Sequence, residues 1–400
     1  MREAGGTNRR DFLAACAIGV GSSWNIANVG PGADQIAAHY GIAVAIVGFF
    51  TTTVFAGEFI AMATIDRALA RFGAKWLGVL AVSLCIAGNL VLLLGGGVAL
   101  ALLLRLIIGA GVGWGFVCGS AYVQRSGGGA LHQGIYGGVS LAAGGSAVAI
   151  VPVLTGSLGW EAPYVFAIVA GAATLPLIFV GTAVRPPADH PRERSAYELI
   201  KDRRLMRFAL VHSASFGLSI ILSNWVVNVL SGDGGYSEKA AGLIGAMILV
   251  LGIFSRPGGG LFVHLRPQRA RALLMAVVSA GAVGSFVLGL APALPFALVA
   301  TLLIGFSSGA PFGTLVAGIG RVFPDSPGAA FGAMNTYALT LIIVGTPLVG
   351  LTLSLPGHGL IGFAACSAVC IVAGCFLPPQ KLLEPPAETA AGPEPVAAAD

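Results

Sequence analysis

The chain of 400 residues contains few charged side chains. Asp, Glu, Lys and Arg make up only 10% of it, whereas an ordinary soluble domain has about 25%. Hydrophobic residues make up 56%, and the mean hydropathy is +0.88. So little polar surface cannot cover a water-soluble globule of this size. The composition therefore excludes an ordinary soluble domain and indicates that lipid is the main solvent.

The sequence also lacks the patterns that mark enzymes, ATP-driven pumps and metal sites. None of the six cysteines belongs to a Cys-x-x-Cys pair, and all six lie in apolar runs, which is typical of small buried side chains. The absence of a Walker motif argues against ATP-driven pumping by this chain. No Ser/His/Asp or Cys/His spacing supports an enzyme. We therefore expect no enzymatic activity, no metal site and no cofactor.

Apolar runs of about 20 residues recur along the whole chain, which is long enough for helices that cross a bilayer. Strands are excluded because lipid does not tolerate open sheet edges, and a barrel would need alternating ten-residue segments. We therefore predict an all-α polytopic membrane protein with twelve transmembrane helices. They are expected at about 12–37, 43–65, 75–96, 98–123, 132–158, 161–183, 207–231, 237–263, 270–290, 293–319, 328–354 and 357–377.

The basic residues outside the spans gather on one side of this twelve-span arrangement. That side holds Arg9 and Arg10, Arg67, Lys75 and the basic residues of the central connector, whereas the opposite side has one cation, Lys239. The positive-inside rule then places both termini in the cytoplasm. We expect a multi-pass protein of the inner (plasma) membrane. The net charge of +5 is explained by the basic residues on the cytoplasmic side, and no nucleic-acid partner is expected.

The stretch "TNRRDFLAACAIGVG", which begins at Thr7, permits two interpretations. Its Arg pair resembles a twin-arginine export signal, and "LAAC" resembles the lipobox of a lipoprotein signal. Cleavage before Cys16 would truncate the first span and scramble the segregation of the cations. We therefore expect an uncleaved cytoplasmic anchor, in which Arg9 and Arg10 hold the chain end inside and Cys16 is an ordinary buried thiol.

The two halves of the chain can be aligned at a constant offset. Phe12 pairs with Phe208, which is 196 positions further on (208 minus 12), and the same offset pairs polar and aromatic residues as well as glycines. Parallel six-span repeats related about the membrane normal are a known transporter architecture. Further pairs at this offset are Asn28 with Asn224, Tyr40 with Tyr236, Gly109 with Gly305, Gly113 with Gly309, Phe116 with Phe312 and Arg125 with Arg321.

The repeat predicts two six-helix bundles related by pseudo-twofold symmetry, with tails and a linker outside them. The C-terminal tail is rich in Pro, Ala and Glu, and it cannot bury enough apolar area to order itself. The expected parts are a cytoplasmic N-tail at 1–11, an N-terminal bundle at 12–183, a cytoplasmic linker at 184–206, a C-terminal bundle at 207–378 and a disordered C-tail at 379–400.

Three stretches resemble motifs of one transporter family. "RLIIGAG", Arg105 to Gly111, is similar to the R-x-x-x-G-x-G motif of a fourth span. "IDRALARFGAKW" is similar to the G-x-x-x-D-R-x-G-R-K loop between the second and third spans, and "RPGGGLFVHLRPQR" is similar to its degenerate second copy. Over about 12 to 378 the chain thus resembles a bacterial transporter of the major facilitator superfamily (MFS). The resemblance implies two six-helix bundles and transport by alternating access.

The match to the loop motif is imperfect and has two registers. In one register Asp66 and Arg67 form the Asp-Arg pair, but Met62 replaces the glycine. In the other, residues 71–75 fit well, but Ala70 stands where the Asp belongs. We favour the first register because it supplies the carboxylate. The Gly-Pro motif of antiporters is not recognisable in the fifth span, which argues modestly against antiport.

The residues of this loop and of its second copy form a candidate cytoplasmic gate. A carboxylate at a helix end can bridge to the amides and cations of a neighbouring helix and so close the cytoplasmic side. The alternative for this set is simple anchoring by positive charge, and we favour the gating role. For Arg256 alone we favour snorkelling to the interface. The candidate gate residues are Asp66, Arg67, Arg71, Gly73, Lys75, Arg256 and Arg266.

Charged residues within the spans are the candidates for proton coupling, because a charge in the bilayer is costly and is usually functional. Glu58 lies eight residues before Asp66, about 12 Å deeper along the helix. An apolar setting favours its protonated form, as coupling requires. Arg105 could pair with Glu58, bind an anion or bond to backbone carbonyls of the first span. Asp34 is a third candidate, although we favour its interpretation as a water-exposed residue at the outer end of the first span.

The resemblance implies that the first, fourth, seventh and tenth spans line the substrate cavity. Asn25 and Asn28, and likewise Asn224 and Asn228, are spaced so that each pair shares one helix face. Hydrogen bonding between helices is the alternative role of these amides. Tryptophans on these spans suggest a substrate with an apolar or aromatic part. The candidate cavity residues are Trp24, Asn25, Asn28, Trp114, His212, Asn224, Trp225, Asn228, Ser307, Ser308 and Thr314.

These features favour a proton-linked secondary transporter for a small organic solute, such as an anion or an amphiphile. One alternative is an uncoupled facilitator or small-anion exchanger in which Arg105 binds the anion. Another is a receptor or complex subunit without transport activity. The expected partners are the small-molecule substrate, protons and the lipid bilayer, and a monomer is expected.

Overall fold

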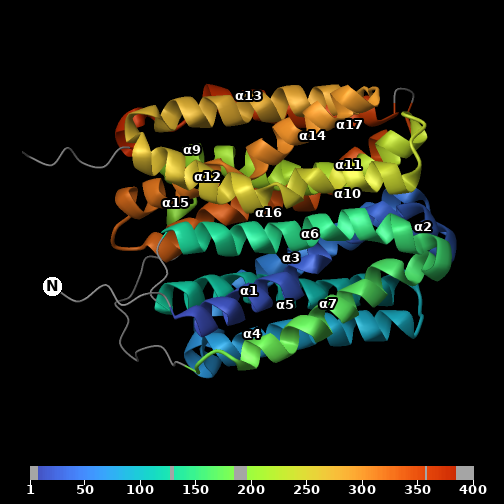
Figure 1. Cartoon of the computed structure of the whole chain (residues 1–400), viewed down its shortest axis with the longest axis horizontal. Helices are drawn as coiled ribbons and strands as arrows, with labels where there is room; N and C mark the ends of the chain where they lie inside the picture. Colours follow the sequence, from blue (N-terminus) through green and yellow to red (C-terminus); the bar gives the residue numbers. More distant parts are fainter. Residues whose placement is uncertain (1–7, 127–129, 184–195, 356–357, 384–400) are drawn as a thin grey trace, which may run out of the picture.

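Long helices run side by side through the computed structural model of the chain (Figure 1). The structure describes residues 8–126, 130–183, 196–355 and 358–383, and these ranges contain helices but no strand. Within them, nine helical stretches are long and apolar enough to cross a bilayer, and a bent pair, Arg9–Ile26 with Gly30–Tyr40, would make a tenth. The predicted class, an all-α multi-pass membrane protein, is confirmed.

The helices of the first half gather on one side of the bundle, coloured blue to green in Figure 1. The Asn8 side chain caps the first helix by accepting a hydrogen bond from the Arg10 amide at 3.1 Å. These helices are α1 (Arg9–Ser23), α2 (Ala33–Tyr40), α3 (Val44–Met62), α4 (Ile65–Leu93), α5 (Val98–Arg125), α6 (Ala130–Leu158) and α7 (Ala162–Phe179).

The helices of the second half gather on the other side, coloured yellow to red. Several of its spans are interrupted. A π-helical turn, Ser213–Gly217, separates α9 from α10, and Pro311, which lacks an N–H donor, begins α15 directly after α14. The helices are α8 (Ala196–Leu199), α9 (Arg203–His212), α10 (Leu218–Gly232), α11 (Glu238–Val250), α12 (Gly252–Leu265), α13 (Ala270–Gly289), α14 (Leu294–Gly309), α15 (Pro311–Val322), α16 (Pro327–Thr352), α17 (His358–Cys375) and α18 (Gln380–Leu383).

The first span is broken, whereas a continuous helix was expected over about 12–37. After α1 come two 3₁₀ turns, Trp24–Ile26 and Gly30–Gly32, and the axis bends by 41° before α2. The second turn contains Pro31, which cannot donate a backbone hydrogen bond to a continuing helix. Asn25 lies in the first turn and Asn28 in the irregular segment after it. The prediction that these two residues share a helix face is therefore wrong.

The connection between the second and third spans is mostly helical, whereas the sequence predicts a loop. Helix α4 already begins at Ile65, and it is kinked at Gly73, whose φ is 71° and ψ 162°. A side chain at this position would be strained, because residues with a Cβ rarely adopt a positive φ. Gly73 thus allows the connection and the third span to join as a single bent element.

The two halves are tightly joined at the end of the bundle that holds α2, called here the α2 end. Thr51 Oγ1 donates a hydrogen bond to Asn224 Oδ1 at 2.6 Å, and Gln35 Nε2 lies 3.4 Å from a carboxylate oxygen of Glu238. The backbone of Gly30 also packs so closely on Asn224 that a Cβ at Gly30 would overlap the Asn224 carbonyl. The α2 end is therefore closed in this structure.

The opposite end, called the basic end, is where α1 and α9 begin (Figure 1). Here the buried carboxylate of Asp11 ties α1 to the chain segment after α7. It accepts hydrogen bonds from the Thr182 amide at 2.7 Å, the Thr182 hydroxyl at 2.9 Å and the Tyr122 hydroxyl at 3.2 Å. The stretch after the Arg pair is thus an integral part of the folded bundle. Residues 1–7 of the expected N-tail and 384–400 of the expected C-tail lie outside the described residues.

Candidate functional site

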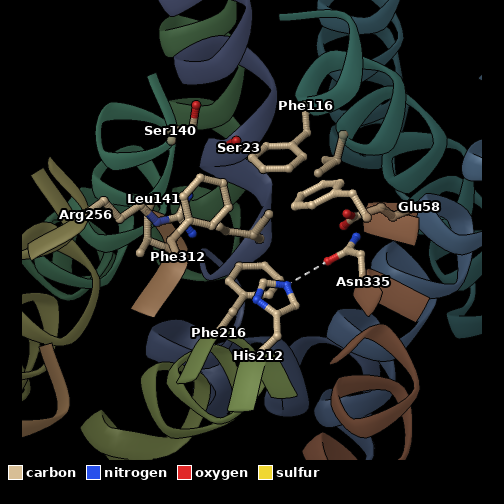
Figure 2. Close-up of a pocket in the computed structure, with 14 residues that line it drawn as sticks. Ser23, Glu58, Phe116, Ser140, Leu141, His212, Phe216, Arg256, Phe312 and Asn335 are labelled. Carbon is tan, nitrogen blue, oxygen red and sulfur yellow. Dashed lines mark hydrogen bonds between the residues drawn. The ribbon is translucent and has the colours of Figure 1, made fainter. Parts of the chain in front are cut away.

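A cavity lies between the two halves, bounded by side chains from both (Figure 2). Its volume is about 30 Å³. Because sites for drug-sized ligands are about 300–1,000 Å³, a solute of that size enters only if the halves move apart. Its lining residues are Ser23, Ile26, Glu58, Val112, Phe116, Gly137, Ser140, Leu141, His212, Phe216, Arg256, Phe312, Phe331 and Asn335.

Glu58 places a carboxyl group on the first-half side of this cavity. Its side chain is only 4% exposed, and no basic side chain lies within ion-pair distance of it among the residues that the structure describes. Gly113 makes this position possible, because a Cβ there would lie 3.0 Å from the Glu58 Cα. Glu58 is therefore a buried acid without a counter-ion, which is a costly arrangement in a membrane interior.

Asn335 of α16 links Glu58 to His212. The His212 ring donates from Nε2 to Asn335 Oδ1 at 3.2 Å, while the Asn335 amide nitrogen points toward the Glu58 carboxyl group (Figure 2). That amide nitrogen is buried and has no hydrogen-bond partner among the described residues. Glu58, Asn335 and His212, called here the polar cluster, thus place two groups that can hold a proton, a carboxyl group and an imidazole, on either side of one amide.

Arg256 of α12 reaches the cavity from the second half. Its side chain is 2% exposed, so the prediction that it snorkels to the interface is wrong. The guanidinium carbon lies 4.5 Å from the ring centre of Phe312 and 6.0 Å from that of Phe216. Gly137 leaves room for it, because a Cβ there would lie 2.5 Å from Nη1. Stacking on aromatic rings explains why this cation points inward.

Four phenylalanine rings contribute to the remaining cavity surface. Phe312 and Phe331 pack edge to face with ring centres 6.2 Å apart, and Phe216 stacks on His212 at 5.4 Å. Phe116 completes the group from α5. None of these four rings was a predicted site residue, although the pairing of Phe116 with Phe312 in the repeat was a usable signal. Asn335 was missed as well, because a lone amide in an apolar span has no distinctive pattern.

Arg105 holds together the broken first span and does not face the cavity. It is 1% exposed, and its Nε donates to the Phe50 carbonyl at 3.2 Å. Its Nη2 donates to the Asn25 carbonyl at 3.0 Å and to Asn28 Oδ1 at 3.2 Å. Of the three roles that the sequence left open, the structure favours bonding to backbone carbonyls. No ion pair joins Arg105 and Glu58, both of which the structure describes.

The amides of the first span are engaged within the first half. Asn25 Oδ1 accepts from Asn89 Nδ2 at 2.8 Å, and Asn28 Nδ2 donates to the Pro163 carbonyl at 3.0 Å. Asn89 was not predicted from the sequence. These bonds satisfy the backbone and side chains around the break, which is the alternative role considered for these residues.

The predicted tryptophans also lie outside the cavity surface. The Trp225 indole N–H donates to the Thr346 carbonyl at 2.8 Å, and that of Trp114 donates to Thr64 Oγ1 at 3.1 Å. Trp24 is 5% exposed, and its indole nitrogen has no partner among the described residues. The structure brings none of the three to the cavity in this conformation.

The other predicted polar residues are likewise away from the cavity. Asn224 belongs to the α2 end, as does Asp34, which is exposed at the start of α2. Ser308 donates to the Ile248 carbonyl at 3.0 Å. Of the predicted cavity set only His212 lines the cavity. Its remaining members are placed elsewhere on α10, α14 and α15: Asn228, Ser307 and Thr314.

The candidate gate residues at the basic end do not form one cluster. Lys75 Nζ donates to the carbonyls of Phe179 at 3.1 Å and Gly181 at 2.6 Å, which fastens α4 to the end of α7. The other gate residues whose side chains the structure describes, apart from Arg256, are exposed: Arg67, Arg71 and Arg266. The side chain of Asp66, the predicted gate carboxylate, lies outside the described part of the chain.

Comparison with known proteins gives one positive result. The model of the family described as Major Facilitator Superfamily matches residues 13–346, which include most of the helices described above. A comparison with curated proteins finds no match.

Proposed function

The chain belongs to the major facilitator superfamily, and on that premise we propose that it is a proton-coupled secondary transporter for a small organic solute. Members of this family are membrane transporters. In the proposed cycle, the central cavity binds the solute and opens to one side of the plasma membrane and then to the other. The observation that carries the proposal is the polar cluster, in which the Asn335 amide bonds to a buried histidine of the second half and faces a buried acid of the first half.

The proposed topology has twelve spans in two six-helix bundles, at 12–183 and 207–378. The nine apolar stretches become twelve spans in three steps: the 49-residue stretch Leu131–Phe179 counts as two spans, the bent pair adds one, and α17 adds another. The 3₁₀ turn Gly159–Glu161, which separates α6 from α7, supports the division of Leu131–Phe179 into two spans. Gathering of exposed Arg side chains at the basic end supports cytoplasmic termini. With the α2 end closed, separation of the two halves at the basic end would then open the cavity to the cytoplasm.

The polar cluster supports coupling because of how a buried carboxyl group behaves. Glu58 has no counter-ion here, so its neutral, protonated form is favoured while the cavity is closed. Its proton can be released when water enters the opened cavity. The His212–Asn335 bond spans α9 and α16, so relative movement of these helices would change the surroundings of the acid. Proton loading and helix movement are thereby linked.

The alternative in which Arg105 binds a transported anion is less well supported. Two of its nitrogen atoms already donate to carbonyl and amide oxygens of the first half, and it does not line the cavity. The structural role of Arg105 leaves Glu58 and Arg256 as the charged residues that line the cavity.

Uptake into proteoliposomes tests the proposal. The purified full chain is reconstituted, and uptake of labelled organic solutes is measured with and without an imposed proton gradient. Wild type is expected to accumulate its solute only with the gradient. Glu58→Gln is expected to abolish accumulation but to retain exchange of solute between the two sides. Gradient-independent accumulation, or full accumulation by Glu58→Gln, would contradict proton coupling through Glu58.

A further inference from the structure

Arg256 is a buried cation without a counter-anion. No carboxylate lies within ion-pair distance of its guanidinium among the described residues. Its Nε and Nη1 atoms are buried and have no hydrogen-bond partner among these described residues. A buried charge without a partner is strongly unfavourable, and stacking on Phe312 offsets only part of that cost. The described part of the protein therefore supplies no anion to balance the charge of Arg256.

The buried cavity atoms without a hydrogen-bond partner among the described residues include two donors of Arg256, Nε and Nη1, and the Asn335 amide nitrogen, which faces the Glu58 carboxyl group in Figure 2. The two Arg256 donors are therefore the ones left for a ligand. A ligand that satisfies them must offer acceptors. A carboxylate offers two oxygens and a negative charge, whereas an ammonium group offers only donors.

The apolar surface around Arg256 includes four aromatic rings. Phe116, Phe216, Phe312 and Phe331 line the same cavity, where Phe312 packs edge to face on Phe331 and Phe216 stacks on His212. A planar apolar group packs well on such surfaces, in offset or edge-to-face contact. The lining residues thus fit a ligand with an acidic group at one end and an aromatic ring at the other.

We propose that the transported solute is an aromatic monocarboxylate whose carboxylate is bound by Arg256 and whose ring packs among the four cavity phenylalanines. This inference rests on the proposed function, since it names the substrate class of the same cavity. It differs from the sequence prediction, which placed an anion at Arg105 and an apolar group at the tryptophans.

Binding to the purified full chain in detergent tests the inference. The probes are benzoate, its neutral analogue benzamide, the cation benzylammonium and the non-aromatic anion acetate, each scored as a shift in thermal unfolding. Benzoate is expected to raise the melting temperature in a saturable way. Benzamide, benzylammonium and acetate are expected to bind at least tenfold more weakly. Equal binding of benzamide, or absence of saturable benzoate binding, overturns the proposal.

Two substitutions of Arg256 and one control locate the anion site. Arg256→Gln is expected to abolish benzoate binding, and Arg256→Lys to weaken it about tenfold, because Lys keeps the charge but neither the planar donors nor the stacking. Arg269→Gln removes an exposed cation at the basic end and is expected to bind like wild type. If Arg256→Gln does not fold, Arg256→Lys decides. Wild-type benzoate affinity in either folded variant overturns the proposal.

Failure of the substrate class is distinguishable from failure of the proposed function. If benzylammonium or benzamide is bound and taken up into proteoliposomes while benzoate is not, the anion proposal is wrong and the transporter proposal stands. If benzoate binds through Arg256 but no gradient drives its uptake, the binding site stands and the transport proposal is wrong.

Discussion

Glu58 of α3 and Arg256 of α12 lie near, but not at, equivalent positions in the two halves, because the repeat offset carries Glu58 to Phe254 (58 plus 196). Each packs against a glycine of the internal repeat, and the two glycines are 196 positions apart (309 minus 113). A Cβ at Gly113 would lie 3.0 Å from the Glu58 Cα, and a Cβ at Gly309 would lie 3.0 Å from the Arg256 backbone nitrogen. The two side chains enter one cavity from opposite sides (Figure 2). The same packing thus presents an acid from one half and a base from the other.

The polar cluster makes Asn335 a testable link. Asn335→Leu introduces an apolar side chain of similar size and so removes both the acceptor of the His212 bond and the amide that faces Glu58. We expect at least a tenfold loss of proton-driven uptake, with exchange across the membrane largely retained, since exchange needs no net proton transfer. The measurement compares initial rates in proteoliposomes with and without a proton gradient.

Thr336→Val is the matched control for this prediction. Thr336 is the next residue of α16, and its hydroxyl donates only to its own helix, at the Gly332 carbonyl. Its loss is expected to leave both rates unchanged. Proton-driven uptake by Asn335→Leu at the wild-type rate would show that the amide does not link the two residues.

Arg105 is expected to support stability and not solute selection. Arg105→Gln leaves the carbonyls of Phe50 and Asn25 without their buried donor, which corresponds to about 3 kcal/mol. A lower melting temperature of the purified protein is expected, with unchanged preference among anionic, neutral and cationic ligands. Arg269→Gln serves as the exposed-cation control. A stable Arg105→Gln variant with altered ligand preference would favour the anion-exchanger alternative instead.

Gly30 controls closure of the α2 end. Gly30→Val places a side chain where the Asn224 carbonyl lies, so the two halves cannot approach there as they do in this structure. The α2 end should then stay open. A cysteine introduced at Thr51, which is 1% exposed, should react with a water-soluble maleimide much faster in the Gly30→Val background. Gly156→Ala, with no atom within 4 Å of its Cβ, is the control at the same end. Equal labelling in all backgrounds would contradict this role for Gly30.

Asp202, which lies outside the apolar stretches, confers a pH dependence on stability. Its carboxylate caps α9 by accepting from the Arg204 amide at 2.7 Å, and the hydrogen bond from the Arg204 side chain lowers the pKa of that carboxyl. Because the pKa is lower in the folded state, the stabilisation is present above the unfolded value of about 3.9 and is lost as the pH falls through the folded value. Asp202→Ala should cost about 1 kcal/mol at neutral pH.

Thermal unfolding of wild type and Asp202→Ala across acidic pH measures this effect. The two melting temperatures should differ at neutral pH and converge as the carboxyl of the wild type is protonated. A difference that persists at the lowest pH would mean that the cap does not act through the charged form.

The positions of the spans could be predicted because they depend on apolar length and on basic flanks. The runs around 98–123 and 270–290 correspond closely to α5 and α13. The interruptions were harder to predict. Pro31 and Pro311 are visible in the sequence, but proline within a membrane helix is often tolerated, so its presence alone does not locate a break.

The cavity surface could not be predicted because helices of this kind are apolar on all sides. In α5 neither the Arg105 side nor the Trp114 side carries a pattern that distinguishes the cavity from a helix contact. Polar residues in such helices satisfy one another first, as Asn25 and Asn89 do. Glu58 was found because an acid in a span is rare, whereas Arg256 was placed at the interface because its depth from the helix end alone permitted snorkelling.

The opposite charges of Glu58 and Arg256 have a consequence for energetics. If Glu58 is ionised when the carrier crosses empty, its charge balances Arg256 and the cavity is electrically neutral. When the carrier crosses with a carboxylate and a proton, the carboxylate balances Arg256 and Glu58 is uncharged, so the cavity is neutral again. A net charge would feel about 2.3 kcal/mol per 100 mV of membrane voltage. Such a carrier would be electroneutral, so its accumulation would depend on the pH difference and not on the voltage.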